Sequence, residues 1–184
     1  MTRFPTLAAI ALGAVLGLGA CATGTPPSQS YAETTLLTAE SRQALEKRLG
    51  AFDREINRGN MSATIDYLPP KIIALMSEET GASPEFMKAA AGAMMEGLTT
   101  GMKIRGGHDL SQALVGTAEN GQPYAVIPGA VRIDVRGESM TDQGYTLALT
   151  DAGTWYLVAL NDQDSIAEVR RAYPEFRSVA LPLR

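Results

Sequence analysis

His108 and Asp109 form the adjacent pair of side chains best suited to chemistry. Histidine titrates near neutral pH and can act as a general base, and a neighbouring carboxylate can orient it. In an extended strand, however, adjacent side chains point to opposite faces of the sheet. The pair also follows Gly106-Gly107, where an aspartate is typical of a bend. The sequence therefore predicts no catalytic set, and it leaves His108 and Asp109 as the residues to examine for one.

Other motifs that carry chemistry are missing from the sequence. No serine stands in a GxSxG nucleophile elbow, and neither a GxGxxG fingerprint nor a GxxxxGK[ST] phosphate loop occurs. One histidine and one cysteine exclude an HExxH motif and a Cys-rich zinc site, so no metal and no cofactor is expected. The chain has 16 basic and 20 acidic residues, and this net charge of −4 argues against a nucleic-acid partner.

The single cysteine, Cys21, closes a segment with the features of a targeting signal. Arg3 supplies a positive charge, and residues 7–20 carry none. At about 1.5 Å per residue this apolar run spans roughly 21 Å, which is short of the ~30 Å hydrocarbon core of a bilayer. It is therefore a signal-peptide core and not a transmembrane helix. The run ends in Leu18-Gly19-Ala20-Cys21, which resembles the lipobox of bacterial lipoproteins, with a less typical glycine at its second position.

The lipobox resemblance implies how this chain would be processed and placed. Residues 1–20 would be removed, and Cys21 would take a diacylglycerol on its thiol and an acyl chain such as palmitate on its amine, which is enough for stable anchoring. Ala22 stands where an aspartate would favour the inner membrane, so the resemblance implies an outer-membrane anchor facing the periplasm. Residues 21–37 would be the lipidated end and a flexible tether. The alternatives are an ordinary secretory signal with a coincidental cysteine, and a buried cysteine in a cytosolic helix.

Three main helices are predicted in the mature chain, the first two of them before any strand. Between those two, residues 61–68 can form a short helix and Pro70 can begin another turn or two that reaches Met76. Leu45, Leu49, Phe52 and Ile56 recur at helical spacing over 39–58, with Asp53 and other charged residues on the remaining faces. Ser83 and Pro84 begin a helix that runs to Thr100. Its stripe of larger side chains, and the five methionines between 76 and 102, are expected to pack in the core and not to form a binding surface. A short last helix begins with a capping box and ends at Pro174. The stripe consists of Met87, Ala90, Met94 and Leu98, and the capping box of Ser165 and Glu168.

Period-two patterns predict four antiparallel strands between these helices. The first strand region is 102–117, with a bulge or bend at Gly106-Gly107, and Asn120-Gly121 is a hairpin turn into the second, 123–136. A strand through 145–150 and a three-residue loop at 151–153 lead into the last strand, 155–160. Helices followed by strands predict an α+β domain over residues 38–184, with N-terminal helices on a curved four-stranded sheet and a short C-terminal helix.

This order of elements resembles the NTF2-like, cystatin-like fold. The resemblance covers roughly 38–173 and rests on the amphipathic first helix, on Tyr67-Leu68-Pro69 and on the strands Gly-Tyr-Thr-Leu and Thr-Trp-Tyr-Leu. It implies a cone with an apolar cavity between sheet and helix. Some members are isomerases or dehydratases, which need a carboxylate base and a Tyr–Asp pair. The candidates by residue type are Asp66, Tyr67, Tyr124 and Asp134, and they match no motif.

Three function classes are open from the sequence. The first is a non-catalytic, lipid-anchored envelope protein whose domain binds a small apolar ligand or an envelope protein. The second is an isomerase or dehydratase with His108 or a buried aspartate as its base. The third is a structural subunit that forms a homodimer through an exposed sheet face.

Overall fold

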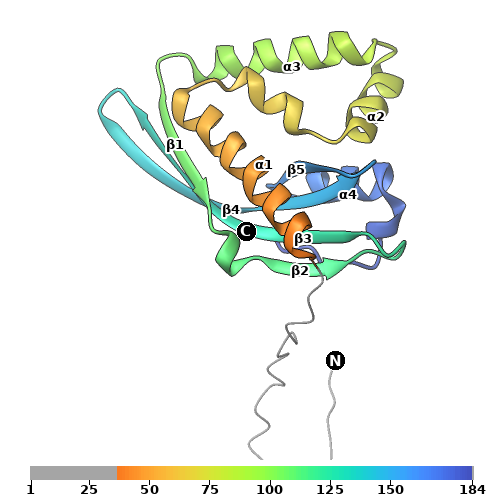
Figure 1. The fold of residues 1–184 in the computed structure, drawn as a ribbon. Coiled ribbons are helices and arrows are strands. Elements are labelled where there is room, and N and C mark those ends of the chain that lie inside the picture. Colours follow the sequence, from red (N-terminus) through yellow and green to blue (C-terminus); the bar gives the residue numbers. More distant parts are fainter. Residues whose placement is uncertain (1–36, 184) are drawn as a thin grey trace, which may run out of the picture. The chain divides into compact units, whose positions relative to one another are not determined.

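The structure, a computed structural model, describes residues 37–183 (Figure 1). The predicted signal peptide and the lipobox with Cys21 lie outside the described residues, as does the predicted tether up to residue 36. In the part that is described, no helix is both long and apolar enough to cross a membrane.

The helices begin and end largely where their capping residues predict. α1 (Ala39–Arg58) begins after Thr38, whose side chain accepts a hydrogen bond from Ser41 N, and it ends at Gly59 with a φ of 77°. α2 (Pro70–Thr80) and α3 (Pro84–Thr99) each have proline at their first position. α4 (Gln163–Ala172) differs from the prediction, because Asp162 is the N-cap and Ser165 is its partner in the capping box, so Glu168 has no part in it. Short 3-10 turns complete the set: η1 (Ser62–Tyr67), η2 (Leu110–Gln112) and η3 (Pro174–Phe176).

The sheet is antiparallel throughout and runs in the order β1-β3-β4-β5. β1 (Lys103–His108) and β2 (Leu114–Thr117) pair with different stretches of the long strand β3 (Pro123–Val135), so the sheet is four strands wide. β4 (Glu138–Asp151) follows β3, and β5 (Thr154–Leu160) forms the far edge. The first strand region breaks at η2 and not at the glycine pair, because Gly106 and Gly107 stay in register with Val131 and Ala130.

Two tight turns fix this register. Arg136-Gly137 joins β3 to β4 with φ of 50° and 87°, and Ala152-Gly153 joins β4 to β5 with φ of 47° and 77°. Positive φ at both central residues is typical of the two-residue turns that match strand twist. The predicted three-residue loop at 151–153 is wrong, because Asp151 already pairs with Thr154 across the ladder.

Packed side chains cover both faces of the sheet. α1 lies across one face, which we call the α1 face; α4, η3 and the chain end cover the other, which we call the α4 face (Figure 1). The predicted α+β class, with helices on a curved antiparallel sheet and a short C-terminal helix, is therefore confirmed. Residues 33–184 group as one compact unit, whose described part, residues 37–183, holds both cores, so we expect this segment to fold on its own. The α1-face core includes Leu45, Leu49, Ile127, Ala148 and Leu157, and the α4-face core includes Val126, Leu147, Leu160, Val169 and Tyr173.

α3 is attached more loosely than its sequence predicts. Gly92 is its one fully buried residue, and it approaches Ser62 of η1 closely enough that a Cβ would come within 3.4 Å of the serine Cβ. Phe86, Met94 and Leu98 are 61–63% exposed. The expected core packing is therefore wrong for Ala90, Met94 and Leu98 of the stripe, and also for Met102, which is 39% exposed. The small residues of α3 around Gly92, and not its large ones, face η1.

Candidate functional site

Asp53 is carried to the sheet by the buried face of α1. It follows Leu49 by four residues and precedes Ile56 by three, and both of these side chains are buried. Residues at this spacing share one face of a helix. The sequence pattern places Asp53 with the outward-facing charges of α1, and the structure corrects this.

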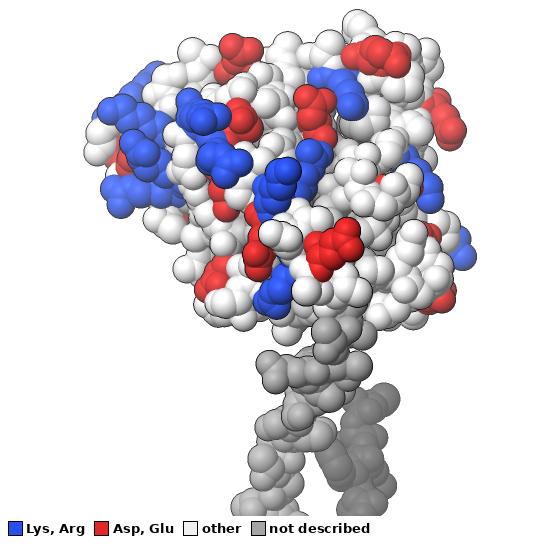
Figure 2. All heavy atoms as spheres, viewed as in Figure 1, with Lys and Arg blue, Asp and Glu red and all other residues white. Residues whose placement is uncertain are grey.

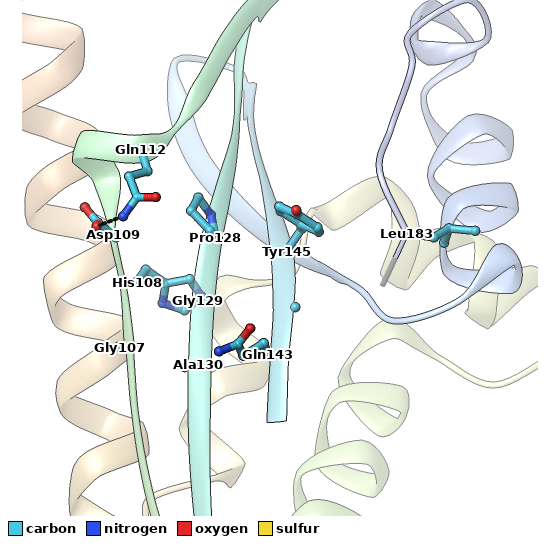
Figure 3. A pocket seen from close by; sticks show the side chains of 11 residues that line it. Gly107, His108, Asp109, Gln112, Pro128, Gly129, Ala130, Gln143, Tyr145 and Leu183 are labelled. Atoms are coloured by element: carbon cyan, nitrogen blue, oxygen red, sulfur yellow. Dashed lines mark hydrogen bonds between the residues drawn. The ribbon is translucent and has the colours of Figure 1, made fainter. Parts of the chain in front are cut away.

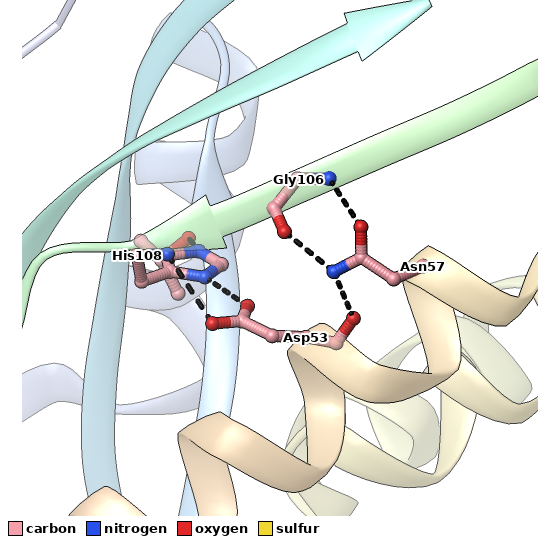
Figure 4. A network of polar contacts seen from close by, with 5 residues as sticks. Asp53, Asn57, Gly106 and His108 are labelled. Carbon is pink, nitrogen blue, oxygen red and sulfur yellow. Dashed lines mark hydrogen bonds and ion pairs between the residues drawn. The ribbon is translucent and has the colours of Figure 1, made fainter.

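The carboxylate of Asp53 holds His108 at the end of β1 (Figure 4). Asp53 Oδ1 lies 2.6 Å from His108 Nδ1, and Asp53 Oδ2 accepts a hydrogen bond of 3.3 Å from the His108 backbone N–H. The second ring nitrogen, Nε2, lies 2.9 Å from Thr146 Oγ1 on β4. In the neutral ring with its proton on Nδ1, the imidazole donates to Asp53 and accepts from the Thr146 hydroxyl.

Asn57, one turn after Asp53 on α1, completes the contact between helix and strand. Its side-chain NH2 donates to the backbone carbonyls of Asp53 and Gly106, each at 2.7 Å, and its Oδ1 accepts from Gly106 N at 3.2 Å. The Asn57 side chain thus satisfies both the backbone carbonyl and the backbone N–H of Gly106, two residues before the histidine on β1.

The Asp53–His108–Thr146 chain has the order of groups found in catalytic triads: a carboxylate, an imidazole and a hydroxyl. The histidine side chain is only 8% exposed, however, and Thr146 is 7% exposed. Both ring nitrogens already have partners within the fold. The arrangement therefore acts as a polar clamp between α1 and two strands, β1 and β4.

Asp109 does not join this clamp. Its carboxylate turns to η2, where it accepts hydrogen bonds from Ser111 N at 3.0 Å and Gln112 Nε2 at 2.6 Å. Hydrogen bonds from Ser111 and Gln112 lower the pKa of Asp109. The two adjacent candidates thus point apart, as expected, and Asp53 occupies the place beside His108 that sequence proximity offered to Asp109.

The remaining candidates by residue type do not come together. Tyr67 packs in the α1-face core and Tyr124 against the α4-face core, so the sheet separates them. Asp66 pairs with Lys88 at 3.4 Å and is exposed. Asp134 accepts hydrogen bonds from Arg132 and Ser139 near the turn that joins β3 to β4. No Tyr–Asp oxyanion pair forms among these four residues.

An open pocket of about 680 Å³ lies where β1, β3 and β4 run side by side (Figure 3). Gly107, Gly129 and Gly144 contribute its floor from three strands. Apolar walls come from Pro128, Ala130, Tyr145 and Leu183, and the amides of Gln112 and Gln143 add polar atoms.

The pocket opens on the α4 face of the sheet. Side chains alternate along a strand, and His108 and Thr146 point to the α1 face. Gly107 and Tyr145, their neighbours, therefore face the other way. His108 borders the pocket while its ring lies on the opposite side. The α1 face, where the NTF2-like resemblance implies a cavity, is filled there by Leu45, Leu49 and Ile127 at 0–4% exposure.

A second hollow, of about 480 Å³, lies between η1 and α3. It is lined by small and charged side chains, Ser62, Ala93 and Glu96 among them, and it is more open to solvent and more polar than the pocket on the α4 face. Within residues 37–183, no three metal-ligating side chains lie together. The pocket on the α4 face is thus the better candidate for a binding site.

Comparisons with known proteins add little to this site. No protein-family model matches the chain, and no curated protein sequence matches it. Among solved structures, Aln2 from a Streptomyces species, determined at 1.8 Å, aligns with a TM-score of 0.44 and 13% sequence identity, over 73% of this chain and 98% of Aln2.

Proposed function

We propose that this protein is a lipid-anchored cell-envelope protein whose domain binds a small apolar ligand in the pocket on the α4 face and catalyses no reaction. The lipobox at Leu18-Gly19-Ala20-Cys21 supports the anchor, and the absence of Asp at position 22 supports the outer membrane.

The pocket itself carries the proposal. A volume of about 680 Å³ lies within the range of small-molecule sites, about 300–1,000 Å³. Pro128, Tyr145 and Leu183 offer apolar and aromatic surface, and two glutamine amides can fix a ligand's orientation. The glycine floor lets a ligand approach the backbone closely.

A neutral apolar dye, 1-N-phenylnaphthylamine, tests ligand binding by residues 33–184, because its fluorescence rises in apolar surroundings. We expect a saturable rise with one site per chain. Ala130→Trp should abolish it by filling the pocket, whereas Ala159→Trp, at an exposed position on β5 outside the lining, should leave it unchanged. No saturable binding, or equal binding by both variants, would refute the pocket.

The mass of the native protein separates this proposal from the homodimer alternative. Native mass spectrometry of the protein released from cells should show a monomer with an extra mass of a few hundred daltons that is lost on activation. A dimer without extra mass would support the structural subunit instead.

An isomerase or dehydratase is the second candidate, and the Asp53–His108 pair at the pocket edge favours it. Its base would have to reach the ligand, whereas the imidazole lies across the sheet from the pocket with both nitrogens engaged. His108→Asn separates the two functions. In a ligand binder, this variant loses stability and keeps the dye affinity. In an enzyme, a ligand found by mass spectrometry would be converted by the wild type and not by the variant.

A further inference from the structure

Three rows of side chains cross the α4 face, and their chemistry changes along the strands. Residues of the first two rows line the pocket, and the third row lies next to it. The first row pairs Pro128 with Tyr145. The second, two residues further along β3, consists of Gly107, Ala130 and Gln143. The third consists of Arg105, Arg132 and Thr141. The face therefore runs from apolar through amide to cationic, over about 13 Å from the first row to the third.

All three rows share one face because of the strand alternation. Gly106 faces α1, since a Cβ there would meet Ile56 and Val131 side chains at 3.5 Å and 3.1 Å. Arg105 on β1 and Arg132 on β3 must then point to the opposite face, which is the face of the pocket. Leu183 from the chain end closes the apolar side of the pocket.

Arg105 and Arg132 stand directly opposite each other in the ladder. Like charges directly opposite each other destabilise a sheet, so this pair lowers the stability of the free domain. A bound anion would remove that repulsion. Arg132 is partly neutralised, because its Nε donates to Asp134 at 3.1 Å and its NH2 group to Ser139 at 2.8 Å. Arg105 is exposed, and among residues 37–183 no hydrogen bond or ion pair engages its guanidinium.

The charges around the third row leave the surface next to the pocket positive. On the α1 side of the molecule, which Figure 2 shows, lysine and arginine side chains also gather at the left, over the projecting end of β1 and the β3–β4 hairpin. Lys103 lies two residues before Arg105 on the same strand, opposite Asp134. Asp109, at the other end of the pocket, has its carboxylate occupied by Ser111 and Gln112.

We propose that the pocket's ligand is an amphipathic anion, with its apolar chain over Pro128 and Tyr145 and its carboxylate or phosphate head at Arg105 and Arg132. This inference rests on the proposed function and adds the chemical class of the ligand. A guanidinium presents a planar fork of donors that matches either head group, and the strand spacing leaves room for a chain of medium length between the apolar and cationic rows. A free fatty acid and a lipid phosphate share this chemistry.

Displacement of 1-N-phenylnaphthylamine from residues 33–184 tests the inference with three probes of equal chain length: decanoate, decyl phosphate and decanol. We expect at least one of the two anions to bind about tenfold or more tightly than decanol, with an advantage that shrinks as NaCl is raised. The anion that binds more tightly, decanoate or decyl phosphate, identifies the head group as a carboxylate or a phosphate. Arg105→Gln combined with Arg132→Gln should remove the advantage and leave decanol and dye binding unchanged.

A matched double variant controls for the general loss of positive charge. Lys47→Gln with Arg54→Gln removes two exposed charges from α1, on the far side of the sheet, and should leave anion binding as in the wild type. Equal affinity for decanol and both anions, or undiminished anion binding by the arginine variant, overturns the inference and leaves the pocket standing. Failure of all three probes and of the dye to bind would overturn the proposed function with it.

Discussion

The imidazole of His108 rests on the backbone of Gly129, its register partner on β3. A Cβ on Gly129 would come within 2.9 Å of His108 Cδ2 and 3.2 Å of the Gly107 carbonyl oxygen. Real Cβ atoms do not approach that closely, so this glycine is required by the ring above it. The clamp on the α1 face and the bare floor of the pocket on the α4 face therefore share one residue.

Gly129→Ala should push the ring out of the clamp. We expect a loss of about 1–3 kcal/mol in the free energy of unfolding, which is typical of overpacking in a tight site. Denaturant unfolding followed by circular dichroism measures it. Gly107→Ala is the matched control, because a Cβ there meets nothing within 4 Å. Equal stability of the two variants would show that the ring does not rest on Gly129 in solution.

Asp53→Ala should leave His108 Nδ1 without an acceptor in a ring that is 8% exposed. An unsatisfied buried donor costs about 1–3 kcal/mol of folding free energy. Thermal and denaturant unfolding report the change. Asp66→Ala removes an exposed aspartate that pairs with Lys88, and a surface pair of this kind is worth about 1 kcal/mol or less. A smaller loss for Asp53→Ala than for Asp66→Ala would contradict the clamp.

Arg105→Thr should stabilise the free domain, because it removes the like-charge contact with Arg132. Cross-strand pairs contribute about 0.2–1 kcal/mol, and we expect a gain of this size in the free energy of unfolding at low salt. Lys103→Thr, one row away, removes an opposite-charge neighbour of Asp134 and should not stabilise. Destabilisation by Arg105→Thr would mean that its guanidinium already has a stabilising role in the free protein.

Tyr173 should make the domain sensitive to alkali. Its hydroxyl donates to Asp151 Oδ2 at 2.8 Å, and burial, followed by the nearby Asp151 carboxylate, raises the pKa of Tyr173 far above its usual value near 10. The folded state therefore holds this proton when the unfolded state has lost it. Stability from this group is complete below about pH 10 and falls by up to about 1.4 kcal/mol per pH unit above it.

Tyr173→Phe should remove that part of the alkaline destabilisation. The free energy of unfolding, measured from pH 8 to 11, should fall less steeply in the variant than in the wild type. Parallel curves would show that the Tyr173 hydroxyl ionises equally in the folded and unfolded states.

Cys21→Ser should prevent lipid attachment. When bacterial cells that produce the variant are fractionated, the protein should be missing from the detergent-extracted outer-membrane fraction. Labelled palmitate should no longer be incorporated. Ala22→Asp, which keeps the cysteine, should leave the label in place and shift the protein to the inner membrane. Label in Cys21→Ser would refute the lipobox.

Local sequence signals predicted the elements well because each signal acts within a few residues. Thr38 and Gly59 bound α1 as their capping preferences require, and Asn120-Gly121 turns the chain into β3. The Arg136-Gly137 turn was missed, because arginine is not a residue that favours a left-handed backbone. Without that turn, the register that aligns Arg105, Arg132 and Thr141 could not be derived.

The site was harder to predict because its residues meet only through packing. Fifty-five positions separate Asp53 from His108, and nothing local joins them. One signal was available: Asp53 lies at helical spacing from both Leu49 and Ile56, which marks a carboxylate turned toward the core. Asp109 was the candidate to orient His108 because it is the next residue in the sequence. The strand alternation correctly predicted that the two side chains point apart.

Because α3 is loosely packed, we expect it to unfold locally while the rest of the domain stays folded. With Gly92 as its one fully buried residue, α3 has little apolar contact to lose when it detaches, so its opening should require far less free energy than global unfolding. Amide protons of α3 should exchange with solvent well before those of β3 and β4. A protease should find its first cleavage site in this helix while the clamped sheet stays folded.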